Sequence, residues 1–310
     1  LYRAKADGRG AFHFFERAMD EQLQARRALE LDLRRALAAG EFELFYQPLY
    51  HLGDERVTGC EALLRWRHPE RGMVSPADFI PLAEEIGLIV QLGEWVLRHA
   101  CAEAARWPDH VRLAVNLSPA QFRDRGLVRT VVSALAASSL PAQRLELEIT
   151  ESVLLQDSAA NMTMLHDLKA LGVRISMDDF GTGYSSLSYL RSFPFDKIKI
   201  DQTFVRDILD DSDAMAIIKA VLDLGASMGI VTTAEGVETL EQLNALRGQG
   251  CAEIQGYFIS RPAPATEIAR LLGVERIVEA AAPVVTFSHG EKVGPAPRAL
   301  EDEGLHRLEA

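Results

Sequence analysis

Eight short runs of apolar and β-branched residues recur between residues 42 and 260, and most are separated by segments with helical periodicity. Strands that alternate with helices form βα units and a parallel sheet, and eight such units can close into a barrel. The first two runs are joined only by HLGDE (51–55), which is too short for a crossover helix, so they should pair antiparallel. We therefore predict an α/β fold, a modified (β/α)8 TIM-like barrel with one antiparallel strand near the start. The eight runs are 42–50, 56–66, 111–118, 144–150, 173–180, 195–201, 230–236 and 253–260.

The barrel should occupy residues 41–275, and three other segments flank it. Residues 21–40 are rich in helix formers and end at a glycine, which predicts a linking or docking helix. Residues 1–20 are too short to fold alone, and Pro and Gly interrupt every pattern in 276–310, which predicts a flexible tail. The partial apolar stripe of the predicted helix consists of Leu23, Leu29, Leu33 and Leu37.

Charge and cysteine content exclude several classes of protein. The net charge of -12 disfavours binding to DNA or RNA polymers or to anionic membranes by phosphate neutralisation. Cys60, Cys101 and Cys251 are far apart and lack CxxC spacing, so a cytoplasmic domain without disulfides or zinc is expected. The sequence begins without Met, so it is expected to be a piece of a longer protein, which could itself be membrane-anchored.

Polar residues close or follow the predicted strands. If the strands form one barrel, its rim should collect these side chains. Oxygen ligands without His or Cys favour Mg²⁺ or Mn²⁺, and so many carboxylates favour two ions, which indicates phosphoryl or phosphodiester chemistry. The residues are Glu61, Asn116, Glu148, Asp178, Asp179, Lys199 and Glu235.

Alternation within the strands places charges inside the barrel. RLELEIT directs Glu146 and Glu148 to one face, and FDKIKID does the same for Lys197 and Lys199. The negative charge of acids on an inner face must be compensated, and we expect metal ions at the barrel mouth to do so. For the lysines, the alternative to a role at the site is that they form salt bridges to the acids of neighbouring strands.

The acidic pair Asp178–Asp179 poses a geometric problem. Adjacent strand residues point to opposite faces, so both reach one site only if the strand breaks between or just after them. Gly181 and Gly183 favour such a break. Each of these signals is weak alone, because an Asp pair is often a helix cap, but together they mark the ends of different strands.

Residues 27–273 resemble an EAL domain, a family that hydrolyses cyclic di-GMP to linear pGpG. The opening LYRAKADGRG resembles the last helix and turn of a GGDEF diguanylate cyclase domain, which implies that residues 1–20 are its remnant and that the parent is a GGDEF-EAL tandem protein with upstream sensor domains. The EAL resemblance rests on YQP (46–48), EALLRW (61–66), NLS (116–118), ELEITES (146–152), DDFGTGYSSLSYL (178–190), KIKID (197–201), AEGVE (234–238) and QGYFISRP (255–262).

The resemblance implies a role for each matching residue. It assigns the first metal to Glu61, Asn116, Glu148 and Asp178, and the second to Asp178, Asp179 and Glu235. Lys199 would contact the attacking water and form the catalytic set with Glu61 and Glu235. Substrate contacts would come from Arg65, Gln47, Gln255 and Asp179, and Glu151 and Ser185 would steady the DDFGTGYSS loop. The family also implies a homodimer through 178–190 and inhibition by Ca²⁺, whose looser coordination disturbs the site.

Two other functions remain open. A catalytically silent cyclic di-GMP receptor would have the same fold, although every expected metal position is filled here. An unrelated Mg²⁺ barrel of the enolase type, with Lys199 abstracting a proton, explains the acids but not the motif series. Phe204, Tyr184 and Tyr257 could stack on bases, but core packing is the expectation for each, and Glu238 is expected to support the site rather than bind metal.

Overall fold

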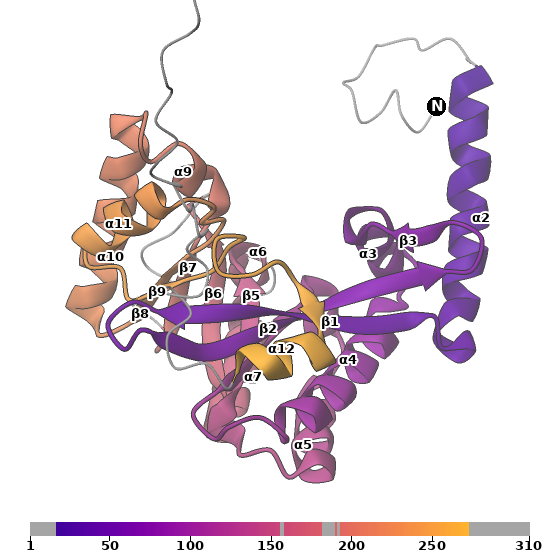
Figure 1. Ribbon diagram of the computed structural model, residues 1–310. Helices are drawn as coiled ribbons and strands as arrows, with labels where there is room; N and C mark the ends of the chain where they lie inside the picture. Colours follow the sequence, from indigo (N-terminus) through magenta and orange to yellow (C-terminus); the bar gives the residue numbers. More distant parts are fainter. Residues whose placement is uncertain (1–16, 156–157, 182–189, 191–192, 273–310) are drawn as a thin grey trace, which may run out of the picture.

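Eight strands close into the predicted barrel in the computed structural model, which describes residues 17–155, 158–181, 190 and 193–272 (Figure 1). Around the barrel each strand pairs with the next, and the last pairs with the first. The first strand is antiparallel to both neighbours, and the other pairs are parallel, as predicted. The strands are β1 (Phe42–His51), β2 (Arg56–His68), β4 (Arg112–Leu117), β5 (Leu145–Thr150), β6 (Arg174–Phe180), β7 (Lys197–Ile200), β8 (Val231–Ala234) and β9 (Glu253–Ile254).

Two short strands, β3 (Gly72–Val74) and β10 (Ala263–Pro264), were not predicted and pair antiparallel with β2 and β1. The last predicted strand, 253–260, was too long, because only its first two residues join the sheet. The chain leaves the sheet at Gly256, whose backbone packs so closely on Val237 that an added Cβ would lie 2.1 Å from the Val237 carbonyl oxygen. Only glycine fits there.

Helices surround the barrel, and their apolar faces form one continuous core with the outer faces of the strands. Leu97 and Cys101 of α4, for example, are fully buried in it with Leu113 of β4. The helices are α2 (Arg17–Ala39), α3 (Pro76–Glu85), α4 (Ile89–Ala104), η1 (Pro119–Arg123), α5 (Leu127–Ser138), η2 (Ala142–Arg144), α6 (Glu151–Leu155), α7 (Ser158–Ala170), α9 (Gln202–Arg206), α10 (Ser212–Met228), α11 (Leu240–Gly248) and α12 (Ala265–Leu271).

A second, smaller core lies at one end of the β1–β2 hairpin, where α2, α3 and β3 gather (Figure 1). Leu33 and Ala36 of α2 are fully buried there against Trp66 and Phe79. Leu29 and Leu37 pack at its edge, whereas Leu23 is 53% exposed, so only the C-terminal part of the predicted stripe contacts the barrel domain. The role of this helix as a linker remains a prediction.

The barrel interior contains a charged layer below the rim. Lys197 Nζ lies 2.6 Å from Glu146 and 2.9 Å from Glu253, and Arg174 and Arg112 contact the same two carboxylates. Burial by itself would raise the pKa of Glu253. The positive charges of Lys197 and Arg112 outweigh burial and lower this pKa to about 2. The expectation that metals compensate the inner acids is therefore wrong for Glu146, and the salt-bridged alternative is correct for Lys197.

Candidate metal and phosphodiester site

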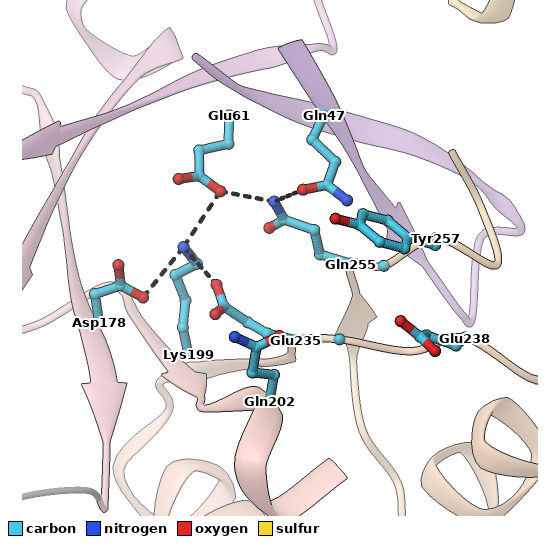
Figure 2. Close-up of a pocket in the computed structure, with 11 residues that line it drawn as sticks. Gln47, Glu61, Asp178, Lys199, Gln202, Glu235, Glu238, Gln255 and Tyr257 are labelled. Atoms are coloured by element: carbon cyan, nitrogen blue, oxygen red, sulfur yellow. Dashed lines mark hydrogen bonds and ion pairs between the residues drawn. The ribbon is translucent and has the colours of Figure 1, made fainter. Parts of the chain in front are cut away.

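Lys199 lies at the centre of the rim, with its ammonium group among four carboxylates. Its Nζ lies 2.6 Å from Glu235, 3.1 Å from Asp178 and 3.6 Å from Glu61 (Figure 2). It also lies 2.9 Å from Glu148, and the lysine is 1% exposed. The carboxylates come from β2, β5, β6 and the chain just after β8, so closure of the barrel brings them together. The arrangement concentrates more negative charge than one lysine can balance.

Two amide side chains clamp the Glu61 carboxylate. Asn116 Nδ2 donates to Glu61 Oε1, and Gln255 Nε2 donates to Glu61 Oε2 at 2.6 Å. Gln255 also donates to Gln47 Oε1 at 3.1 Å (Figure 2). Gln47 in turn donates to the Ser260 carbonyl. The first, second and last strands of the barrel are thus tied together across the site.

Asp178 and Asp179 reach the same site because β6 is irregular between them. The pairing of β6 with β7 shifts register between Met177 and Phe180, and Asp179 adopts the left-handed region with φ 53°. Such a bulge re-aims a side chain. Asp178, Asp179 and Glu235 consequently offer ligand oxygens that all lie within 4.8 Å of one another. The predicted break is wrong in form, because β6 continues through both residues to Phe180, and an irregularity within the strand brings the two side chains together instead.

The local electrostatics favour a bound cation. Burial, together with Asp178 and Glu61, raises the pKa of Glu235 to about 8, and burial with Asp178 and Asp201 raises that of Asp179 to about 6. The pKa of Glu148 is also raised, mainly by burial. For Lys199, burial lowers the pKa but the surrounding carboxylates outweigh it, so the pKa is raised well above its usual value and the group stays an ammonium.

Two carboxylate oxygens of the site are buried without a hydrogen-bond partner within the described chain, Glu148 Oε1 and Asp178 Oδ1. Asp178 Oδ1 lies 3.1 Å from Lys199 Nζ, whereas Glu148 Oε1 is left for a ligand. An unpaired buried acceptor next to raised carboxylate pKa values fits a divalent cation with oxygen ligands. The residues present therefore fit a divalent cation with oxygen ligands, and Asp178, Asp179 and Glu235 lie close enough together to share one.

The site opens into a cavity of about 230 Å³. Gln202, Glu238 and Tyr257 line this cavity in addition to the residues expected to bind metal or substrate. The sequence analysis missed Gln202, the first residue of α9, because its only signal in the sequence is its position directly after KIKID. Tyr257 is 48% exposed with Arg261 over its ring, so the expectation that it packs in the core is wrong. The lining residues are Gln47, Glu61, Asp178, Lys199, Gln202, Glu235, Gly236, Glu238, Gln255, Gly256 and Tyr257.

The other expected residues lie beside this centre or outside the described chain. Arg65 is half-buried on β2 and lies over the Phe45 ring; burial lowers its pKa, whereas the charges of Glu61 and Tyr257 raise it. Glu151 accepts a hydrogen bond from the Gly181 amide at 3.2 Å, at the start of the DDFGTGYSS loop. Ser185, Tyr184 and most of the expected dimer region lie outside the described residues.

Within the described residues, no helix combines the length and the apolar character needed to cross a membrane.

Two relatives are similar to this chain over most of its length. An uncharacterized signaling protein of Caulobacter vibrioides is 57% identical over 264 residues, which cover 85% of this chain and 33% of that protein. The bifunctional diguanylate cyclase/cyclic di-GMP phosphodiesterase MucR of Pseudomonas aeruginosa is 45% identical over 272 residues, 86% of this chain and 40% of MucR. The chain thus spans well under half the length of these relatives.

A solved structure supports the same grouping. The PaMucR phosphodiesterase in complex with cyclic di-GMP is 45% identical, with a TM-score of 0.75 over 78% of this chain and 99% of that one. The model of the EAL domain family matches residues 30–262, which contain all six expected metal ligands. With the barrel and its acidic rim, this match shows that the chain belongs to the EAL domain family.

Proposed function

We propose that this domain hydrolyses one phosphodiester bond of cyclic di-GMP to give linear pGpG, with two divalent metal ions. One observation above all supports the proposal. The Lys199 ammonium group lies among four carboxylates at the mouth of the barrel, those of Glu61, Glu148, Asp178 and Glu235. The substrate is supported by the relatives, since MucR and its solved structure are named for cyclic di-GMP.

The ligand set divides into two groups that share Asp178. Glu61, Asn116 and Glu148 would complete the first group, and Asp179 and Glu235 the second. When bound there, Mg²⁺ or Mn²⁺ supplies Lewis acidity, which lowers the pKa of water and offsets charge on the phosphate. Ca²⁺ should inhibit, because its larger and more flexible coordination sphere suits this geometry poorly.

The protein side chains orient the reaction. Lys199, which stays an ammonium, would donate hydrogen bonds to the attacking water and to developing negative charge rather than act as a base. Water attacks phosphorus in line, the bond from phosphorus to the ribose oxygen breaks, and that oxygen takes up a proton. Arg65, Gln47, Gln255 and Asp179 would hold the substrate.

Glu151 and Ser185 would steady the loop that follows Asp179. The contact of Glu151 with the Gly181 amide supports this role at the described end of the loop. A homodimer through 178–190 would place the same loop at a subunit interface. We also propose a cytoplasmic domain of a GGDEF-EAL parent with upstream sensor domains, in keeping with the named activities of MucR.

Turnover of cyclic di-GMP by the purified chain tests this function. With Mg²⁺ or Mn²⁺, chromatography should detect pGpG, and either a chelator or Ca²⁺ should suppress it. Asn116→Asp, which keeps an oxygen ligand, is compared with Asn116→Ala, and the first should retain more activity. Binding of cyclic di-GMP without any turnover would instead support a catalytically silent receptor.

A further inference from the structure

The turn that follows Asn116 is anchored to a helix outside the cavity. Ser118 Oγ donates to Glu84 Oε1 of α3 at 2.6 Å. Ser118 also caps η1, because its Oγ accepts from the Ala120 amide at 3.1 Å while its own amide donates to Gln121 Oε1 at 2.9 Å. The hydroxyl and the backbone amide of Ser118 therefore both have fixed partners.

The packing beneath the turn leaves it no room to move toward α4. Gln121 is 4% exposed, and its amide nitrogen would lie 2.1 Å from a Cβ added at Gly93. Leu117 and Phe122, on either side, are buried in the main core. The Glu84 hydrogen bond adds a restraint on the turn from the side of α3.

Ser118 is two residues from Asn116, at the end of β4. Asn116 uses its amide nitrogen to hold Glu61, which leaves its amide oxygen for a metal ion. The Asn116 side chain is exposed, its backbone pairs with Glu148 in the β4–β5 ladder, and β4 ends one residue later, at Leu117. Release of Ser118 would let this end of β4 fray and would move the Asn116 side chain away from Glu61.

Glu84 is separate from the site already described. It is absent from the described residues that line the cavity, and α3 buries Phe79, Leu82 and Ala83 in the second core instead. A carboxylate that accepts from a hydroxyl makes a shorter and stronger hydrogen bond than a neutral pair. The distance of 2.6 Å matches a charge-assisted bond.

We propose that Glu84 is a positioning residue for metal binding: it fixes Ser118, and through Ser118 it orients Asn116 toward Glu61 and the first metal. This inference rests on the proposed metal site. If Glu84 has this role, α3 holds the catalytic rim in place. The second core, in which α3 packs with α2, then supports the rim as well. Metal affinity should therefore depend on a residue that touches neither metal nor substrate.

The test is calorimetric binding of Mn²⁺ to the metal-free protein without substrate. Glu84→Ala should weaken binding about threefold to tenfold, below the effect typical of residues that contact a metal ligand directly. Ser118→Ala should weaken it to a similar degree, and Glu84→Gln should retain part of the affinity. Glu85→Gln is the matched control, because Glu85 is the next residue, is 61% exposed and pairs with Arg26; it should bind Mn²⁺ like the unchanged protein.

A thermodynamic cycle separates positioning from general destabilisation. In an Asn116→Ala background, Glu84→Ala should weaken Mn²⁺ binding no further, since the residue through which it acts is gone. Equal weakening in both backgrounds, or affinity unchanged by Glu84→Ala, would overturn the proposal. If the protein without substitutions binds Mn²⁺ but does not turn over cyclic di-GMP, the phosphodiesterase proposal fails and the positioning role of Glu84 stands. If this protein binds no Mn²⁺, both proposals fail.

Discussion

Asp178 and Asp179 present ligand oxygens within 4.8 Å of each other although they are neighbours in β6. A regular strand would direct them to opposite faces. The left-handed backbone at Asp179, φ 53°, cancels that alternation. A non-glycine residue in this region is uncommon, and Asp is among those that tolerate it best. The second proposed metal position thus depends on one backbone irregularity.

Asp179→Asn should separate the ligand role of this residue from its backbone role. Asn tolerates the same conformation, so the free energy of unfolding should change by no more than about 0.5 kcal/mol. Loss of the charged ligand should lower kcat more than about 100-fold, beyond the losses typical of supporting residues. Calorimetry should find one bound Mn²⁺ per chain in place of two. A variant that still binds two ions would contradict the second position.

Lys199→Met should abolish hydrolysis while metal binding persists. The variant loses the donor to the attacking water, so kcat should fall at least about 100-fold. It also leaves Glu148 and Glu235 without their cation, so the melting temperature of the metal-free protein should fall and Mg²⁺ should restore it. Lys219→Met, on the exposed face of α10, is the control. Turnover close to that of the control would exclude the proposed role of Lys199.

Metal affinity should rise with pH between about 6 and 8. Metal ions bind the ionised carboxylates, and in the metal-free protein the pKa of Asp179 is about 6 and that of Glu235 about 8. At a pH below its pKa, each of these carboxyl groups must lose its proton before it can bind the metal ion. The affinity for metal therefore increases as pH rises through the two pKa values and levels off above pH 8. Calorimetry of Mn²⁺ binding across this range tests the expectation. Glu235→Gln should lose the upper part of the pH dependence, and a flat profile in the unchanged protein would refute the assignment.

Glu253→Gln should destabilise the barrel without removing any group that contacts the cavity. Glu253 accepts from Lys197, Arg112 and Thr58, and breaking such a buried network costs on the order of 3 kcal/mol. Because the pKa of Glu253 is lowered to about 2 from 4.5, its contribution is complete above pH 4.5 and is lost as pH falls toward 2. Urea unfolding at several pH values should show the difference between the two proteins shrinking in that window. The exposed Glu70→Gln serves as control.

Glu151→Ala should affect the metal more than the substrate. The variant removes the acceptor of the Gly181 amide, two residues after Asp179. The loop is then expected to hold Asp179 less well, so half-saturation with Mg²⁺ should require a higher concentration. Binding of cyclic di-GMP should change less. Unchanged dependence on Mg²⁺ would count against the loop role of Glu151.

The sequence alone determined the barrel and most of its rim. Strand alternation and the short link between the first two strands predicted the eight-stranded order and the antiparallel β1, because these follow from local periodicity and chain length. Motifs near strand ends marked Lys199 and Glu235, since a closed parallel barrel gathers strand ends on one rim. Glu61 was expected at a strand end as well, but it lies in the middle of β2, which runs on past the barrel to pair with β3.

The tertiary structure decided how charges pair and which side chains face the cavity. Sequence spacing could not show that Lys197 joins Glu146 to Glu253, because these three residues come from three strands. Nor could it place Tyr257 at the cavity, since a tyrosine in an apolar run fits a core equally well. Partners brought together by barrel closure are far apart in the sequence, 51 residues for Lys199 and Glu148 and 194 for Gln255 and Glu61, and a local pattern carries no information about pairing over such separations.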